Sequence, residues 1–175
     1  MRLSDANAKV SIQALESAGH LFCHLGDRTA VGINTLVPAL AACLGSTNDK
    51  VRQEAVYASD RLVESVDPAL LVQNFAHCVS NGGLRGKALL VDQLEKIIDS
   101  LNATRPQMVV KYALPAAVAM TRQDEGGRSG GPELRAASNQ MWVALARAMG
   151  RQNLIDQCVT LGAQVQQRII DATSS

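Results

Sequence analysis

Apolar residues recur along this chain at intervals of three and four positions, which is the period of an α-helix. The clearest apolar stripes fall within residues 33–44, 51–66, 90–101 and 134–148. No stretch sustains the two-residue alternation of a half-buried β-strand bounded by hairpin turns. The pattern therefore predicts about eight helices and no sheet, which is an all-α fold.

Short polar segments separate the apolar stripes and fall into two groups. We expect GDRTAVG, SVDP, LNATRP and MGRQN to join one helix pair to the next, and STNDK and SNGGLRGK to join the two helices of a pair. RQDEGGRSGGPE is the longest and most glycine-rich of these segments, and we expect it to be mobile. Residues 154–172 are expected to form one C-terminal helix whose polar face caps the domain.

The helical pattern repeats with a period of about forty residues. Pro38 and Pro115 occupy similar places in stripes 77 positions apart, and each is expected to bend its helix because proline donates no backbone hydrogen bond. Basic residues begin the second helix of each pair, at positions 9, 50, 87 and 135. Repeated helix pairs of this length are typical of HEAT-type or armadillo-type α-solenoids, whose pairs bury their apolar faces against their neighbours.

The predicted architecture is a single domain over residues 1–175, an α-solenoid of about four HEAT-type helical hairpins. The first hairpin is expected to be incomplete, because the segment around Lys9 has the pattern of the second helix of a pair. We interpret the chain as a piece of a longer solenoid.

In such a solenoid the turns within pairs lie along one edge, so the recurring basic residues form a row. A lysine or arginine in the first turn of a helix opposes the helix dipole and costs about 0.3–1 kcal/mol. Its recurrence at the repeat period suggests binding to an acidic protein surface, although ordinary solvated surface charge is an alternative interpretation. The basic and amide residues expected on this edge are Asn7, Lys9, Asn48, Lys50, Arg52, Asn81, Arg85, Lys87, Arg122, Arg128 and Arg135. The acidic residues expected there are Asp5, Asp49, Asp124, Glu125 and Glu133.

Composition narrows the functional classes. The net charge is only +1, so a charged partner must be recognised by a local patch, and nucleic-acid binding is disfavoured. Aromatic residues make up 3%, which suits close-packed helices better than a β-sandwich. The four cysteines form no CxxC pair and lie within apolar helical patterns, so we expect a reducing compartment, the cytoplasm. No signal peptide, membrane-spanning run or lipidation motif is visible.

Three local patterns suggest chemistry but have simpler interpretations. His20, Cys23 and His24 share one helix, yet no further ligand cluster accompanies them, so no metal or other cofactor is expected. His77 and Cys78 are adjacent and therefore point about 100° apart on a helix. GGRSGG lacks the spacing of a phosphate-binding loop and no strand precedes it. No catalytic pair is recognisable, so we expect a protein that is not an enzyme.

The turn sequences resemble a known family. SDANAKVSIQALE and STNDKVRQEAV are similar to the starts of second helices in TOG domains, which are HEAT-repeat modules that bind tubulin. NGGLRGKALLVDQLEKI, RPQMVVKYALPAAVAM and GGPELRAASNQMWVALARAMG resemble the last TOG domain of the crescerin family, the TOG-array regulators of axonemal microtubules. The resemblance covers most of residues 1–170.

The resemblance implies that the turns within repeats bind the α/β-tubulin dimer. Carried over by position, the residues that it implies are Asn7, Lys9, Asn48, Lys50, Arg52, Arg85, Lys87, Arg128 and Arg135. Tightly binding TOG domains usually carry a tryptophan in the turn of their first repeat. The only tryptophan here, Trp142, lies far downstream in a helical stripe, and we expect it to pack in the C-terminal core.

The expected function is regulation of microtubule assembly in the cytoskeleton, in the setting of the cilium and its axoneme. The alternative is a HEAT-repeat scaffold that docks another protein by its concave helical face and does not bind tubulin directly. Neither nucleic acid nor membrane is expected as a partner, and the sequence leaves the oligomeric state open.

Overall fold

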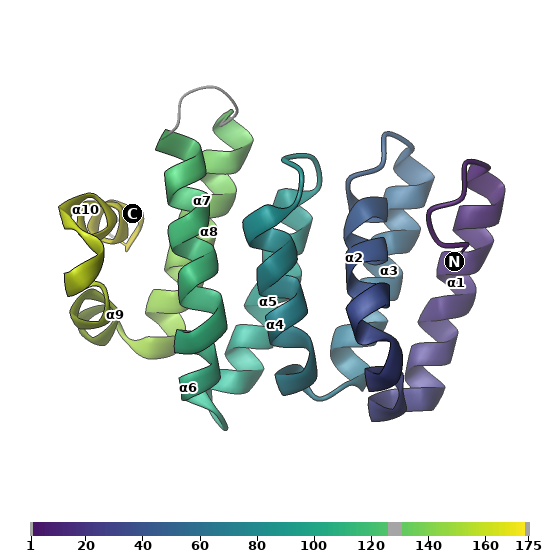
Figure 1. Cartoon of the computed structure of the whole chain (residues 1–175), viewed down its shortest axis with the longest axis horizontal. Helices are drawn as coiled ribbons and strands as arrows, with labels where there is room; N and C mark the ends of the chain where they lie inside the picture. Colours follow the sequence, from purple (N-terminus) through teal and green to yellow (C-terminus); the bar gives the residue numbers. More distant parts are fainter. Residues whose placement is uncertain (1, 126–130, 174–175) are drawn as a thin grey trace.

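A computed structural model of the chain describes residues 2–125 and 131–173. Its longer helices form hairpins that stack side by side from one end of the molecule to the other (Figure 1). The α-helices are α1 (Ala8–Leu25), α2 (Ile33–Leu44), α3 (Asp49–Ser65), α4 (Pro68–Asn81), α5 (Lys87–Asn102), α6 (Pro106–Met108), α7 (Leu114–Glu125), α8 (Pro132–Met149), α9 (Arg151–Gln157) and α10 (Ala163–Thr173). No β-strand occurs among the described residues, so the predicted all-α solenoid is confirmed.

The hairpins form two layers. In the view of Figure 1, α2, α4 and α7 lie in front of α3, α5 and α8, and α1 stands at the N-terminal end of the stack. The turns that join α2 to α3 and α4 to α5 lie at the top, whereas the connections from α1 to α2 and from α3 to α4 lie at the bottom. The prediction that turns within pairs share one edge is therefore confirmed for the described turns.

One connector has regular structure of its own, and one expected helix was wrong. GDRTAVG joins α1 to α2, as expected, and forms a 3₁₀-helix, Gly26–Gly32. The single helix expected over 154–172 is broken into α9, a short 3₁₀-helix (Val159–Leu161) and α10, because Gly162 adopts a positive φ of 99° that lets the chain change direction. The ends of RQDEGGRSGGPE belong to helices α7 and α8, whereas its middle, GGRSG at 126–130, lies outside the described residues, so the expected mobility stays a prediction.

The two prolines that marked the repeat occupy helices, but in different ways. Pro38 lies inside α2. Pro115 lies at the start of α7, directly after a π-helical turn, Val109–Ala113. A π-turn shifts the backbone hydrogen bonds by one residue, which accommodates a proline that has no N–H to donate.

The hydrophobic core continues from hairpin to hairpin. Leu94 and Ile97 of α5 are fully buried between neighbouring helices, as are Leu62 of α3 and Leu145 of α8. Burial of each such side chain stabilises the fold by about 1.5–3 kcal/mol. Trp142 is also fully buried and donates a 2.9 Å hydrogen bond from Nε1 to Thr121 Oγ1, so its predicted packing role is confirmed. Among the described residues, no helix is both long and apolar enough to cross a membrane.

Polar bonds between equivalent positions of neighbouring hairpins fix how the hairpins align. At the edge opposite the turns, Asp27 accepts a 2.7 Å hydrogen bond from the backbone N–H of Asp67, forty positions later. Asp67 in turn pairs with Arg105 at 3.0 Å. On α2 and α4, Asn34 and Asn74 are joined by a 3.1 Å side-chain hydrogen bond, again forty positions apart. These contacts hold the hairpins in one alignment along their length.

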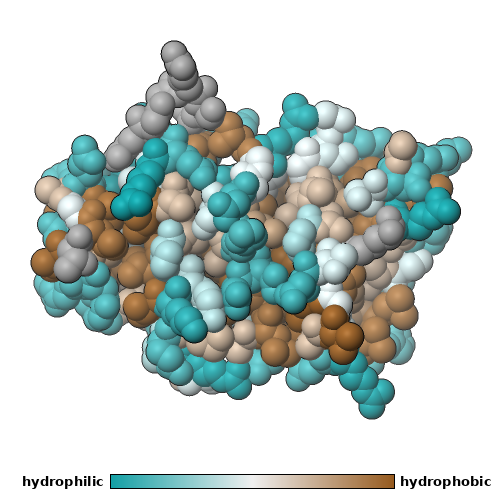
Figure 2. All heavy atoms as spheres, in the orientation of Figure 1, coloured by the Kyte–Doolittle hydropathy of each residue, from teal (hydrophilic) through white to brown (hydrophobic). Residues whose placement is uncertain are grey.

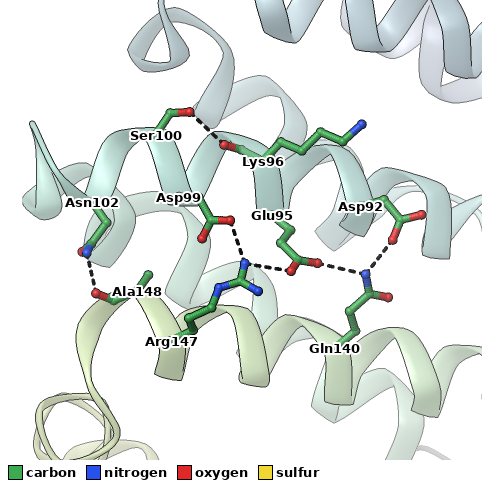
Figure 3. A network of polar contacts seen from close by, with 9 residues as sticks. All are labelled: Asp92, Glu95, Lys96, Asp99, Ser100, Asn102, Gln140, Arg147 and Ala148. Carbon is green, nitrogen blue, oxygen red and sulfur yellow. Dashed lines mark hydrogen bonds and ion pairs between the residues drawn. The ribbon is translucent and has the colours of Figure 1, made fainter.

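A denser network joins α5 to α8 (Figure 3). Arg147 of α8 lies between Glu95 and Asp99 of α5, at 2.8 and 2.7 Å. Gln140 donates to Asp92 at 2.6 Å and to Glu95 at 3.0 Å. Because one arginine bridges two carboxylates one turn apart, sliding of α8 along α5 would break both ion pairs.

Two neighbouring turns come into direct backbone contact at glycines. Gly86 adopts a φ of +81°, and a Cβ built on it would lie 2.6 Å from the carbonyl carbon and oxygen of Leu44. A Cβ on Gly45 would lie 2.9 Å from the carbonyl oxygen of Arg85. Only glycine fits this approach, so the α4–α5 turn rests on the α2–α3 turn with no side chain between them.

Replacing Gly86 by alanine should therefore destabilise the fold by about 2 kcal/mol or more, through left-handed strain and the clash with Leu44. Thermal or urea unfolding followed by circular dichroism measures this loss. Gly83→Ala in the same turn is the matched control, because a Cβ there meets nothing within 4 Å, and its effect should stay within about 0.5 kcal/mol. Equal effects of the two substitutions would contradict the close-approach argument.

Candidate functional site: the turn edge

The turn before α1 is closed by its own polar side chains. Asp5 Oδ1 accepts a 2.9 Å hydrogen bond from the backbone N–H of Asn7, and Asn7 Oδ1 accepts a 3.0 Å bond from the N–H of Lys9. Asn7 is therefore the N-cap of α1. The backbone hydrogen bond from Asn7, together with the Arg2 guanidinium 3.0 Å away, lowers the pKa of Asp5. Lys9 is the second residue of the helix and is exposed.

The turn before α3 has the same construction 41 positions later. Ser46 Oγ takes the place of the Asp5 carboxylate and accepts a 3.2 Å bond from the N–H of Asn48. Asn48 Oδ1 accepts from the N–H groups of Lys50 and Val51 at 3.0 and 3.3 Å. Lys50 is again the exposed second residue of its helix. The recurring Asn-x-Lys pattern thus encodes a cap followed by an outward-pointing cation.

The turn before α5 departs from this construction, and Lys87 is not where the sequence predicted. Gly86 precedes α5 without a side-chain cap, and Lys87 is the first helical residue rather than the second. One position along a helix rotates the side chain by about 100°. Lys87 is consequently only 1% exposed, and the premise that it offers its ammonium group to a partner is contradicted. The position equivalent to Lys9 and Lys50 is Ala88.

Buried Lys87 joins three helices instead. Its Nζ donates a 2.7 Å hydrogen bond to Oε1 of Gln123 on α7. Gln123 Nε2 donates in turn to the carbonyl oxygen of Ser80 on α4, at 2.5 Å. Burial lowers the pKa of Lys87 because it disfavours the charged form. Lys87 is therefore a structural link directly beneath the turns.

Two of the predicted arginines already form hydrogen bonds or ion pairs within the protein. Arg52 is half-buried, donates a 2.8 Å bond to the carbonyl oxygen of Ser46 and pairs with Asp49. Arg135 lies 3.4 Å from the buried carboxylate of Asp124 but remains 65% exposed. Both can contact a partner only by sharing or leaving these bonds. Arg128 lies outside the described residues, so its role stays a prediction.

Asp124 was expected on the exposed edge, but the structure places it inside. Its carboxylate Oδ2 accepts from Arg168 of α10 at 2.5 Å and from Arg135 of α8 at 3.4 Å. This interaction attaches α10 to the last hairpin. No sequence signal distinguishes Asp124 from an exposed turn acid, because its partner Arg168 lies 44 positions away.

Some of the described lysines and arginines have no carboxylate, other acceptor or aromatic ring against their charged group. Most described lysines and arginines meet a carboxylate, another acceptor or an aromatic ring. The described ones whose charged group meets none of these are Lys9, Arg28, Lys50, Arg85 and Arg122. Lys9, Lys50 and Arg122 lie near the ends of helices at the turns, Arg85 lies in the α4–α5 turn itself, and each of the four is exposed. We call the surface formed by Lys9, Lys50, Arg85 and Arg122, with the capping residues Asn7 and Asn48, the turn edge.

The turn edge changes along the solenoid. In α8 the second helical residue is Glu133, which is exposed and acidic, where α1 and α3 have lysines. The basic row that the sequence suggested in four turns is thus built in two different ways. Capped lysines supply it in the first two turns, and Arg85 and Arg122 supply it farther along.

The histidine and cysteine pattern near the end of α1 has local explanations. His24 Nδ1 is 2.8 Å from the carbonyl oxygen of His20, and the His20 ring meets Tyr57 edge to face with centroids 6.2 Å apart. In the ranges that the structure describes, no group of three histidine, cysteine or acidic residues is arranged to hold a metal ion.

Comparison with known proteins gives related sequences and folds, although no protein-family model matches the chain. The TOG array regulator of axonemal microtubules protein 1 of Homo sapiens and that of Mus musculus are each 31% identical to it over 166 residues, which is 91% of this chain and 9% of each relative. The chain therefore spans about a tenth of the length of these curated relatives.

Solved structures share the fold. The MAST/Orbit N-terminal domain superposes with a TM-score of 0.69 at 20% identity, over 99% of this chain and 77% of that one. A chain from a structure described as "TOG-tubulin binding specificity promotes microtubule dynamics and mitotic spindle formation" gives a TM-score of 0.71 at 16% identity, over 99% of this chain and 64% of that one.

The stacked hairpins, the capped turns and these similarities define the class: the chain belongs to the TOG domains, a group of HEAT-type solenoid modules. Within that class its sequence relatives include the TOG array regulators of axonemal microtubules, so the family resemblance seen in the turn sequences is confirmed. The more specific likeness to their last TOG domain stays a prediction.

Buried Lys87 and exposed Lys50 allow a direct test of the burial of the Lys87 ammonium group. Lys87→Glu would place a carboxylate against the Gln123 carbonyl oxygen in a buried site, and should destabilise the fold by about 3 kcal/mol or more. Lys50→Glu changes the same charge at an exposed site and should change stability by less than about 0.5 kcal/mol. Chemical unfolding of both variants measures the difference, and a Lys87→Glu protein as stable as wild type would contradict the burial of this ammonium group.

Proposed function

We propose that this chain is a tubulin-binding module, that it binds the α/β-tubulin dimer through the turn edge, and that it regulates microtubule assembly. The observation that carries the proposal is the position of the uncompensated cations. Lys9, Lys50, Arg85 and Arg122 lie on one edge, whereas cations elsewhere are mostly paired. An acidic protein surface complements such an edge, and the fold is that of a structural module rather than an enzyme.

The way in which the cations are held supports this proposal. The hydrogen bonds between neighbouring hairpins, Asp27 to Asp67 and Asn34 to Asn74, fix the spacing of the turns. The side-chain caps of Asn7 and Asn48 fix where α1 and α3 begin. The cations are therefore presented on a stiff support, so little ordering of the backbone is needed on binding. In our proposal the solenoid holds a tubulin dimer as a rigid body and favours its delivery to a growing microtubule end.

The cellular setting is proposed from the relatives. Their name places those proteins at axonemal microtubules, and the solved structure with a TM-score of 0.71 is described in terms of TOG–tubulin binding. By analogy, we propose that this chain acts in the microtubule cytoskeleton of the cilium. Because it spans only 9% of those relatives, it would contribute one binding unit to a larger activity.

Reversing two charges on the turn edge should weaken tubulin binding. A Lys50→Glu and Arg85→Glu double variant should lower the affinity for α/β-tubulin at least tenfold, because about 1.4 kcal/mol of lost interaction suffices for a tenfold change. Size-exclusion co-migration at low salt gives the first readout, and titration of labelled protein gives the affinity. Wild-type binding should also weaken as salt is added.

The matched control carries the same change of net charge elsewhere. Arg28 lies in the connection at the opposite edge, and Lys111 lies in the π-turn before α7; both are exposed. An Arg28→Glu and Lys111→Glu variant should bind tubulin as wild type does. Equal losses in both double variants would show that only overall charge matters. Wild-type protein that fails to bind tubulin or microtubules would favour a HEAT scaffold for another partner.

A further inference from the structure

A hollow of about 340 Å³ lies directly beside the turn edge, between α2 and α4. Pro38, Ala41 and Ala42 of α2 line one side, Cys78 of α4 lines the other, and Gly83 of the α4–α5 turn lies at the rim. The space exists because these side chains are small. It opens on the face formed by α2, α4 and α7, where the space-filling view shows pale and brown surface among the hydrophilic atoms (Figure 2).

The charge of this groove has one sign. Its ionisable lining residues are His77, Cys78 and Arg85, and none of the lining residues is acidic. His77 Nδ1 lies 3.2 Å from the Asn81 amide nitrogen, and burial raises the pKa of the Cys78 thiol, so this thiol stays neutral. Arg85 is thus the permanent charge of the groove, and it is exposed and unpaired among the described residues.

Arg85 makes the groove continuous with the turn edge, since it belongs to both surfaces. We propose that the groove receives an aliphatic side chain of the α/β-tubulin partner, presented next to a carboxylate that pairs with Arg85. This inference rests on the proposed function and adds an apolar anchor to it. The occupant follows from the lining: apolar walls exclude a charged head, and the single cation at the mouth selects a neighbouring acid.

An apolar anchor would supply binding affinity that the exposed cations alone do not provide. Exposed ion pairs contribute little affinity, about 0–1 kcal/mol each, and are screened by salt. A side chain fully buried in a preformed groove contributes through burial of apolar area, which salt does not screen. The cations would thus orient the partner, and the groove would slow its release.

Filling the groove tests this inference. Ala42 is exposed, helical and part of the lining, so Ala42→Leu occupies the space without breaking α2. We expect tubulin affinity to fall about tenfold, and the ratio to wild type to stay nearly constant as salt rises. The effect of Arg85→Glu should instead shrink with added salt. Gly83→Leu adds bulk at the rim of the groove, where a Cβ meets nothing within 4 Å, and should act in the same direction.

The matched control is Thr35→Leu, on the same exposed side of α2 two turns earlier and outside the groove. It should bind tubulin as wild type does, and circular dichroism should show each variant to be folded. If Ala42→Leu and Gly83→Leu both bind like wild type while Arg85→Glu does not, the groove is empty in the complex. That result overturns this inference and leaves the proposed binding of tubulin through the turn edge standing. If wild-type protein does not bind tubulin, the proposed function and this inference fail together.

Discussion

Every hairpin of this protein depends on burial of apolar side chains on both of its sides. Phe75 of α4 and Ile98 of α5 are fully buried, although a single hairpin has no interior of its own. The chain therefore reaches stability only by stacking, and each hairpin is held by the neighbours before and after it. Apolar packing alone does not fix how far one hairpin slides along the next, because dispersion contacts are not directional.

Polar bonds supply the missing alignment. Asp67 receives one contact from the hairpin before it and one from the chain after it, through Asp27 and Arg105. In the layer that contains α5 and α8, Arg147 fixes α8 against two carboxylates of α5 (Figure 3). The turn edge is a consequence of this alignment, since cations from separate hairpins can share one surface only if the hairpins end at the same level.

The fold could be predicted from the sequence because the signal is local and repeated. Apolar periodicity locates the helices, and the recurring Asn-x-Lys pattern locates two of the turns. The error at Lys87 arose because the repeats were aligned by residue type, whereas Gly86 begins its helix with a different cap and shifts the register by one position. Helix break sites such as Gly162 are equally hard to recognise, because a glycine within a helical pattern is often tolerated.

The contacts that organise the candidate site could not be predicted, because they join residues far apart in the chain. The buried link from Lys87 to Gln123, the attachment of Arg168 to Asp124 and the groove beside Arg85 each depend on which hairpins meet and at what height. Single-sequence periodicity carries no such information. It gives the order of the elements and leaves their mutual contacts to packing.

The glycine contact between turns has a mechanical consequence. Gly86 and Gly45 bring the backbones of two neighbouring turns together, with no side chain between them to compress. Flexing that would push these turns closer meets a hard stop, whereas flexing in the opposite sense only opens the contact. This part of the solenoid therefore resists curvature in one direction much more than in the other, as a hinge with a stop does.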